Sequence, residues 1–304
     1  MKNILISGLV NTETTVQVRQ FPIHYYPIDY PFFGVNTAAS GVAYNIAVAL
    51  NMLGDHVTLL SMTGNDFSAA YIKEELMACG IDTSYIRPQL RQTPNSVVLY
   101  DADGKRQVYC DLKDIQEASY SFEKPLLGHV DLVAACNTNF NRELLHLAKT
   151  AGKPIATDVH VLSDIHDSYN REFMECADIL FLSDEGIGAD YRGFLLELAQ
   201  TYGSKIIVLG RGSKGAAIYQ SSDRQIHEQA AVCVGEVVNT VGAGDALFSA
   251  FLHYYIKGLS PLGALTHAQL FASAKIRVSG AAKGFLTEDE LQAIYECSME
   301  SEVL

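Results

Sequence analysis

A short glycine-rich turn with a carboxylate beside it carries the clearest chemistry in this sequence. The stretch NTVGAGDALFSAFLHYY contains Gly242, Ala243, Gly244 and Asp245, followed by an apolar helical pattern. Small residues let a ligand approach the backbone closely, and the first N–H groups of a helix form a ready anion site. A carboxylate in that first turn can accept a proton from a hydroxyl that attacks a bound phosphate. The turn therefore predicts phosphoryl transfer, with Asp245 as the base.

The same residues also have a purely structural interpretation. Acidic residues are common in the first turn of a helix, where they complement the helix dipole. An isolated GxGD string would be explained in that way. The strand-like stretch 233–238 before the turn indicates a strand, a turn and a helix in succession, which suits either interpretation.

Alternation of strand-like and helical segments predicts the elements that position this turn. Strands are expected at 4–9, 57–61, 132–135, 155–159, 179–182 and 206–209, and helices at 41–53, 69–79, 142–151, 171–176, 194–202, 243–256, 261–278 and 288–296. Such alternation is typical of βαβ units, a mostly parallel sheet and helices on both faces. Asp158, at the end of one strand, is either a site residue or a loop cap, and its place at the carboxyl edge of a parallel sheet favours the site.

Two segments interrupt this alternation. Residues 12–37 are rich in aromatic residues and proline (FPIHYYPIDYPFFG), and residues 93–112 contain two strand-like runs around the turn 101–104. We expect both to form a small sheet that protrudes from the main layers, because long aromatic-rich loops are uncommon in compact domains. The whole chain, 1–304, is then one domain with a lid made by about 12–38 and 92–112.

Composition excludes several classes of function. The chain has 304 residues, 48% of them apolar, and a net charge of 22 − 35 = −13. That charge argues against non-specific nucleic-acid binding and against an anionic membrane as partner. The six cysteines form no CxxC pair or zinc-finger spacing, so reduced thiols in a cytoplasmic enzyme are expected. The apolar run near the N-terminus is too short to span a membrane.

Other motifs either fail or are incomplete. Gly210, Gly212 and Gly215 match the dinucleotide pattern, but the strand-like run Ala-Ala-Ile-Tyr-Gln follows them where that pattern needs a helix. No P-loop GxxxxGK[ST], HExxH pair or GxSxG elbow occurs in the sequence.

The longer string NTVGAGD resembles the second signature of the ribokinase-like (PfkB) carbohydrate kinases. Three further stretches resemble the family in the expected order. They are Ser40-Gly41-Val42-Ala43-Tyr44-Asn45 with Leu53-Gly54, Thr63-Gly64-Asn65-Asp66-Phe67, and Gly210-Arg211-Gly212-Ser213-Lys214-Gly215. The resemblance covers nearly the whole chain. It implies a ribokinase-like three-layer α/β sandwich with a mostly parallel central sheet and a small protruding β-sheet lid.

The resemblance also assigns roles to individual residues. It makes Asp245 the catalytic base and the amides of Gly242, Ala243 and Gly244 an anion hole. The substrate-binding positions are Asn11, Glu13, Gly41 and Asn45. The nucleotide-binding positions are Gly210, Arg211, Gly212, Lys214, Gly215 and Thr240. Structural alternatives stay open: Glu13 as an exposed strand residue, Asn45 as a satisfied buried amide, and Asp66 as a helix cap.

The sequence departs from the family pattern at three places. Asn239 stands where the family usually has Asp, and Val42 where ribokinase has a lysine. The Asn-x-x-Glu motif that helps to place magnesium should fall at 183–186, where only Asp184 and Glu185 could substitute. The first departure bears on cation binding near the anion hole, and the last on the metal.

The resulting hypothesis is an ATP- and Mg2+-dependent kinase acting on a sugar hydroxyl, with K+ left open as an activator. Two alternatives remain: a nucleoside kinase of the same family, and a non-catalytic nucleotide or sugar sensor. The aromatic lid residues could stack on a base or pack within or between lids, and a homodimer through the lid is a further expectation. The sequence does not distinguish the acceptors.

Overall fold

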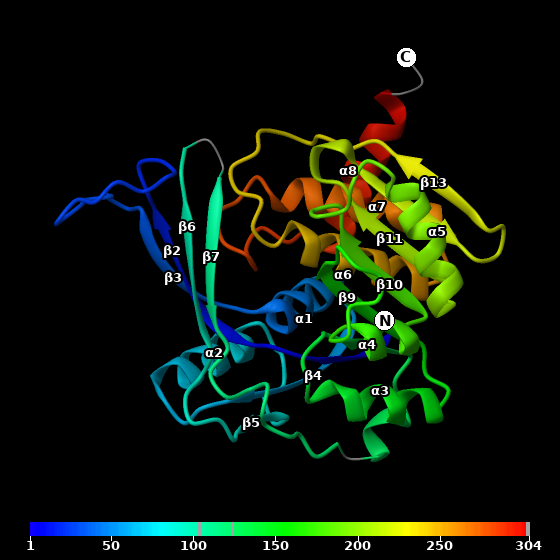
Figure 1. Ribbon diagram of the computed structural model, residues 1–304, viewed down its shortest axis with the longest axis horizontal. Coiled ribbons are helices and arrows are strands. Elements are labelled where there is room, and N and C mark those ends of the chain that lie inside the picture. The colour runs from blue at the N-terminus through cyan, green and yellow to red at the C-terminus, as the bar shows by residue number, and fades with distance from the viewer. Residues whose placement is uncertain (103–104, 123, 302–304) are drawn as a thin grey trace.

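A nine-stranded sheet forms the centre of the protein (Figure 1). The computed structural model describes residues 1–102, 105–122 and 124–301. Strand order is β13-β12-β11-β10-β9-β8-β1-β4-β5, and all neighbours are parallel except β11–β12 and β12–β13. The strands are β1 Asn3–Ser7, β4 His56–Thr63, β5 Ile86–Pro88, β8 Leu132–Ala135, β9 Ile155–Val161, β10 Ile179–Ser183, β11 Ile206–Gly210, β12 Ala216–Gln220 and β13 Gln225–Gln229.

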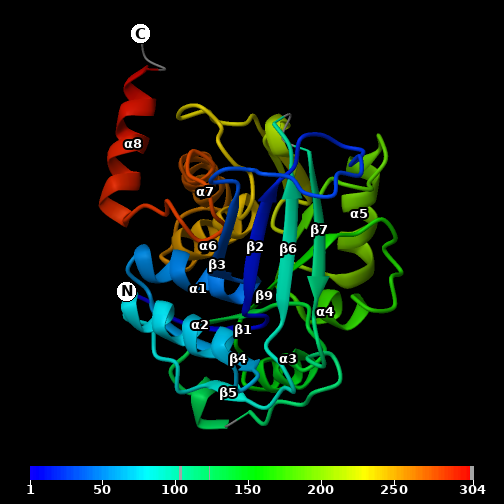
Figure 2. The same ribbon diagram turned by 90° about the vertical axis from the view of Figure 1, so that its left-hand side faces the viewer.

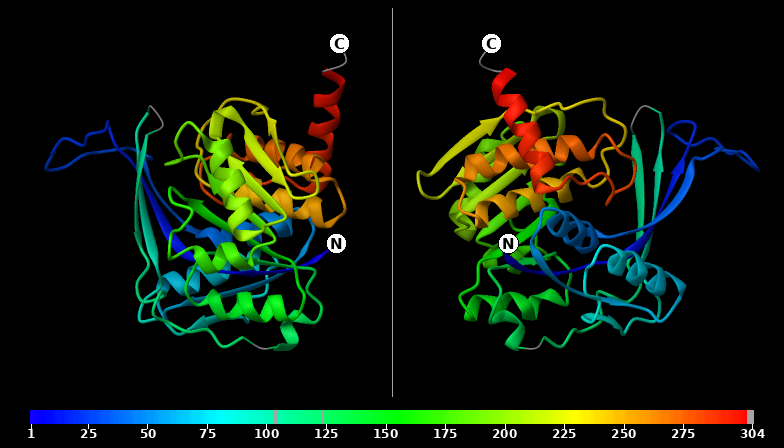
Figure 3. Two further views of the ribbon diagram at one scale, coloured as in Figure 1. Left: turned by 45° about the vertical axis from the view of Figure 1, so that its right-hand side comes forward. Right: turned by 180° about the vertical axis from the view of Figure 1, so that it is seen from behind.

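Helices cover both faces of this sheet, as Figure 3 shows from two sides. Successive side chains of a strand point to opposite faces. Ile4 and Ile6 accordingly pack in one apolar cluster with α1, α6 and α7, whereas Leu5 packs in a second cluster with α3, α4 and α5. The helices are α1 Val42–Met52, α2 Phe67–Ala78, α3 Asn141–Thr150, α4 Arg171–Cys176, α5 Tyr191–Tyr202, α6 Ala243–Ile256, α7 Pro261–Lys275 and α8 Glu288–Ser301, with 3-10 turns at Lys124–Leu127 and Gly212–Lys214. The predicted α/β sandwich is confirmed.

A separate four-stranded sheet stands at one side of the main layers (Figure 2). This small sheet has the order β3-β2-β6-β7, with β2 Asn11–Gln17, β3 Val35–Ser40, β6 Asn95–Tyr100 and β7 Arg106–Asp111. Its strands come from the two segments that interrupt the helix–strand alternation. Part of the predicted turn 101–104 lies outside the described residues.

One predicted strand is wrong. Residues 233–238 contain no strand and run as a loop along the end of α7. Their amides bond to that helix instead of a sheet edge: Val234 N donates to Ser273 Oγ (3.1 Å), and Val238 N to Ile276 O (2.9 Å). The β-branched composition of the loop resembles a strand, but β13 already ends the sheet on that side. Helix α7 also ends at Lys275, earlier than predicted.

No disulfide joins any of the six cysteines, all of which lie among the described residues. Across the described parts of the chain, none of the helices has the length and apolar character needed to cross a membrane.

Candidate active site

Helix α6 starts directly after a glycine that no other residue could replace without strain. Gly242 has φ 81°, in the left-handed region that favours glycine. A Cβ atom built there would lie 2.3 Å from the carbonyl oxygen of Ala281. The turn is therefore held tightly against the segment that follows α7, which fixes the direction in which the helix begins.

The next two residues present the N-terminal end of α6. A Cβ atom at Gly244 would meet nothing within 4 Å, so space for a ligand lies open beside it. The amide of Ala243 donates to Thr240 O at 3.2 Å and is committed to the turn. The amides of Gly244 and Asp245 belong to the first turn, where N–H groups lack an acceptor within the helix. The geometry thus fits an anion, with Gly244 rather than Ala243 at its centre.

Asp245 is held by a residue from the first half of the chain. Asn45 lies in α1 and its Nδ2 donates to Asp245 Oδ2 at 2.6 Å. The alternative interpretation of Asn45 was a buried amide with all its hydrogen bonds made. Only its nitrogen fits that interpretation, because its buried Oδ1 has no hydrogen-bond partner among the described residues. The pair places a carboxylate and an unsatisfied acceptor side by side at the open end of α6.

Burial raises the pKa of the Asp245 carboxyl to about 6. The hydrogen bond from Asn45 and the charges of His160 and Lys275 oppose the increase, while the charge of Asp158 adds to it. A carboxyl group with that pKa is mostly ionised at neutral pH and is still basic enough to take a proton from an alcohol. The electrostatics therefore suit a general base.

The small sheet brings Glu13 and Asn11 to the same place. Glu13 lies on β2, and burial together with the charge of Asp245 raises the pKa of its carboxyl group. It is thus not the exposed strand residue of the alternative interpretation. Asn11 is 3% exposed, and its Nδ2 donates to Ser96 Oγ at 3.1 Å. Its Oδ1, like that of Asn45, is buried and has no partner among the described residues.

Gly41 has a packing role that the sequence analysis did not anticipate. Its φ is 107°, and a Cβ atom would lie 2.5 Å from Leu9 O. The space that a side chain would occupy is filled by the protein's own backbone, which connects β1 to β2. Gly41 therefore lets the small sheet join the start of α1 closely.

The predicted nucleotide side lies at the ends of β10 and β11. Gly210 closes β11, and a Cβ atom there would lie 3.9 Å from Leu247 of α6. Gly212 and Lys214 form a 3-10 turn, and Gly215, with φ 90°, has Gln229 O where a Cβ would lie. Thr240 is exposed beside the glycine turn.

Arg211 differs from the other members of that group. Its guanidinium lies over the ring of Tyr191 and is bonded to Tyr191 Oη and Glu228 Oε2, both at 3.2 Å. Its side chain is engaged with the protein, so any role toward a nucleotide falls to its backbone. The side chain of Lys214 is 68% exposed.

Comparison with known proteins identifies the family of the chain. A sequence model described as "pfkB family carbohydrate kinase" matches residues 1–288. The chain belongs to the pfkB family of carbohydrate kinases. The predicted enzyme class, an ATP-dependent phosphotransferase with an alcohol group as acceptor, is confirmed at the level of this family.

Individual pfkB relatives show the range of the likeness. The chain is 26% identical to fructosamine kinase FrlD of Bacillus subtilis (strain 168) over 239 residues, 76% of this chain and 79% of the relative. A solved structure of a putative ribokinase from Agrobacterium tumefaciens superimposes with a TM-score of 0.86 and 22% identity, covering 98% and 99% of the two chains. Arabidopsis thaliana ribokinase, solved with ribose and ATP, superimposes with a TM-score of 0.79 and 20% identity. The match covers 96% of this chain and 98% of that one. At these identities the solved structures show the shared fold.

Few carboxylate side chains of this protein are placed to bind the divalent metal that pfkB kinases use with ATP. Among the described residues, no group of three or more metal-binding side chains lies together. Asp184 follows β10, and its Oδ2 lies 3.5 Å from Lys214 Nζ. Glu185 bonds through its amide to Ser183 Oγ at 3.3 Å. Of the two candidates, Asp184 contacts Lys214 of the predicted nucleotide turn, so a divalent metal that needs few protein ligands would fit this arrangement.

Sequence analysis missed two charged residues of this pfkB site. His160 follows Asp158 near the end of β9, with φ 60°, and both influence Asp245. Lys275 is fully buried at the end of α7 and acts on Asp245 and Glu13. A basic residue in the last turn of a helix is ordinary, so the sequence gave no signal for Lys275. Asp66, in contrast, caps α2 as the structural alternative had it, accepting from Ala69 N at 2.9 Å.

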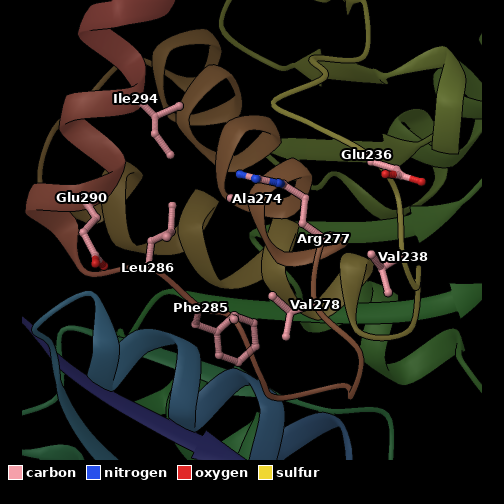
Figure 4. Close-up of a pocket in the computed structure, with 10 residues that line it drawn as sticks. Glu236, Val238, Ala274, Arg277, Val278, Phe285, Leu286, Glu290 and Ile294 are labelled. Carbon is pink, nitrogen blue, oxygen red and sulfur yellow. The ribbon is translucent and has the colours of Figure 1, made fainter.

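A pocket of about 530 Å³ is lined by a different set of residues (Figure 4). It lies between α8, the end of α7 and the loop before the glycine turn, and Figure 4 shows Arg277, Val278 and Phe285 among its lining. None of the predicted catalytic, substrate or nucleotide residues contributes to it. The candidate active site is thus defined by the convergence around Asp245 and not by the size of this cavity.

Proposed function

We propose that this protein transfers the γ-phosphoryl group of ATP to a hydroxyl of a sugar or sugar derivative, with Asp245 as general base. One observation carries the proposal: a carboxyl group with a pKa of about 6 lies beside an open glycine turn at the positive end of a 14-residue helix. A sensor that only binds its ligand has no need of a base tuned in this way.

The acceptor hydroxyl lies against Asp245 in this mechanism. Asn11 Oδ1 and Asn45 Oδ1 accept hydrogen bonds from other hydroxyls of the acceptor, which satisfies two buried atoms that otherwise lack partners. Glu13 accepts another from the side of the small sheet. As the hydroxyl oxygen attacks the γ-phosphorus, its proton passes to Asp245, and the bond from phosphorus to the β-phosphate bridging oxygen breaks.

ATP supplies the phosphoryl group, and a bound Mg2+ would neutralise charge on its phosphates. The amides at the start of α6 hold the transferring group, and Asp184, with Glu185, would hold the metal through water. The backbone of 210–215 and Thr240 would line the adenine and ribose. ATP use and the absence of structural disulfides suit an enzyme of the cytoplasm.

A sugar is favoured over a nucleoside by the position of the aromatic residues. The aromatic segment 21–33, which could have stacked on a base, forms the long connection between β2 and β3 and projects away from the main layers (Figure 1). Tyr25 and Phe33 are 88% and 99% exposed. Side chains with this exposure are not packed against the residues around Asp245.

The same segment supports a homodimer formed through the small sheets. Its exposed apolar side chains are Ile23, Tyr25, Tyr26, Ile28, Tyr30, Phe32 and Phe33. A patch of this kind usually marks an interaction site in a folded protein. A second copy would cover it and steady the sheet that carries Glu13, and movement of that sheet would exclude water during transfer.

Thermal-shift screening with a non-hydrolysable ATP analogue, followed by turnover on the hits, tests the function. The panel contains fructosamines, pentoses, hexoses, 2-keto sugar acids and nucleosides. We expect at least one sugar derivative to stabilise the protein and to be phosphorylated. Stabilisation by ligands without phosphorylation of any of them would favour the sensor. Turnover of nucleosides alone would show that the acceptor is a nucleoside and not a sugar.

A further inference from the structure

A lysine with no exposed surface ends the helix that follows the catalytic one. Lys275 is the last residue of α7, and its side chain is 0% exposed. Its Nζ donates to Gly280 O at 2.7 Å and to Val278 O at 3.3 Å. Long cationic side chains normally keep their charged end in water, and burial of an ammonium costs several kcal/mol unless it is compensated. A helix cap alone does not require that cost.

The carbonyl groups that hold Lys275 belong to the segment that supports the glycine turn. Ala281 O fills the space where Gly242 lacks a side chain. On the same segment, Ile276 O accepts from Val238 N and from Asn239 N at 2.9 and 3.0 Å. Figure 4 shows this chain turning after α7 past Arg277 and Val278. Lys275 therefore ties together the backbone on which the anion-binding turn rests.

The ammonium group also compensates the carboxylates of the site. Burial lowers the pKa of Lys275 to about 8, while the charges of Asp245 and Glu13 raise it, so the group is mostly charged at neutral pH. In return, Lys275 lowers the pKa of Asp245 and of Glu13. The other groups that act on Asp245 are Asn45 of α1 and Asp158 and His160 of β9. The charge of Asp245 in turn raises the pKa of Glu13 of β2 and of Cys136 after β8. Of the charged groups, Lys275 is the one that is both fully buried and fixed by two carbonyl groups.

We propose that Lys275 is an internal monovalent cation for this site: its ammonium group keeps Asp245 ionised and the glycine turn rigid, so that turnover needs no added K+ or NH4+. The inference rests on the proposed function of Asp245 as a base. Lys275 acts through Asp245 and the turn, and is thus a positioning residue. Neutral Asn239, beside the same backbone, is consistent with a site whose cation is already supplied by the chain.

The test compares Lys275→Met with wild type and with Lys283→Met. Methionine keeps the length and apolar character of the buried stem. Lys283 is exposed on the same segment, and its loss removes the same charge from a solvated position. The titration of Asp245 is followed in the whole protein by NMR of isotopically labelled aspartate carboxyl carbons, with the signal assigned by its absence in Asp245→Asn. This measurement requires no acceptor.

We expect the Asp245 titration to move up by about one pH unit or more in Lys275→Met and to stay in place in Lys283→Met. An unmoved titration in a folded Lys275→Met protein would overturn the inference and leave the proposed function standing. If Lys275→Met does not fold, Lys275→Arg serves instead. Because arginine retains the positive charge, the midpoint of the Asp245 titration should stay at its wild-type pH in Lys275→Arg. A midpoint that rises by one pH unit in that variant overturns the inference.

Kinetics separate this inference from the proposed function. Wild type should turn over equally well with K+, NH4+ or only a bulky organic cation in the buffer. Lys275→Met should lose about fivefold in kcat/KM near pH 6, as a one-unit rise in the pKa of the base demands, and added NH4+ should restore part of the loss. If the wild-type enzyme needs K+, the inference is contradicted and the proposed function stands. If no phosphoryl transfer is detected, the proposed function is contradicted, and the NMR titration alone then tests the inference.

Discussion

Asn45 and Asp245, two hundred positions apart, are joined by a 2.6 Å hydrogen bond. The bond connects the helix that follows the small sheet to the helix that follows the glycine turn. It thus connects the expected substrate side of the site to the expected phosphate side, and it lowers the pKa of the Asp245 carboxyl group against the effect of burial. The proposed base and the group that holds it therefore come from the two halves of the chain.

Replacement of Asn45 by alanine should weaken the base through this contact. Loss of the donated hydrogen bond raises the pKa of Asp245, so the acidic limb of the kcat/KM profile should move to higher pH by about half a unit to one unit. The acceptor KM should rise as well, because Asn45 Oδ1 is lost. Asn51→Ala is the matched control in the same helix, since Asn51 Nδ2 bonds to Cys79 O far from the site. Equal profiles for the two variants would contradict this role for Asn45.

The wild-type pH profile should itself show the base. Asp245 must be ionised to accept a proton, so kcat/KM should fall as the pH drops through about 6, the pKa of its carboxyl group. A profile that stays flat down to pH values near an ordinary aspartate pKa, about 4, would speak against Asp245 as the base.

Removal of the Asp245 carboxylate should stabilise the fold. The folded-state pKa of Asp245 lies above its ordinary value, so the native state binds more protons than the unfolded state between about 4 and 6, and stability falls as the pH rises through that window. Asp245→Asn removes this penalty and should raise the Tm at neutral pH by roughly 1–3 °C. The difference should vanish in acid. A lower Tm at neutral pH would show that the charged form is not the costly one.

The two glycines of the turn should respond differently to alanine. Gly242→Ala places a methyl group against Ala281 O at a positive φ, which should destabilise the protein by about 1–3 kcal/mol. Gly244→Ala meets no protein atom within 4 Å and lies within a helix, so the fold should keep or gain stability. Its methyl group would instead intrude on the proposed phosphate site, and the KM for ATP should rise. Denaturant unfolding and ATP titration distinguish the two effects, and an unchanged ATP KM in Gly244→Ala would place the phosphate elsewhere.

The exposed aromatic segment should control the oligomeric state. We expect wild type to sediment as a dimer at micromolar concentration and the double variant Tyr25→Ser, Phe33→Ser to sediment as a monomer. Both side chains are almost fully exposed, so their loss should leave the Tm of the main domain nearly unchanged. A monomeric wild type would remove the support for a lid-mediated dimer.

Local patterns sufficed to predict the layers of the fold. Apolar runs such as 132–135 and 179–182 have few polar interruptions, and a parallel sheet covered on both faces selects this composition. The turn Gly242–Gly244 could be located because its steric demands act within a few residues. The loop 233–238 was predicted as a strand because its residues favour extended backbone, and nothing local reveals that its hydrogen-bond partners lie on α7.

The site residues that sequence analysis missed depend on tertiary contacts. Lys275 has the position of an ordinary lysine at the end of a helix, and only the packing of α7 against the turn shows that its ammonium group is buried. Arg211 shows the opposite case. Its place in a predicted nucleotide-binding turn suggested a ligand contact, yet Tyr191 and Glu228 engage its side chain. Sequence spacing predicts which residues lie at the edge of the central sheet. It does not predict which group each side chain contacts there.

The most direct test of the account compares wild type with Asp245→Asn in phosphoryl transfer from ATP to the best acceptor of the screen. Binding of the ATP analogue serves as the control that the variant's site is intact. We predict that kcat falls by about 10²–10⁴ while the variant stays folded and binds the analogue as wild type does. Turnover within a few-fold of wild type in that variant would contradict the assignment of Asp245 as the base.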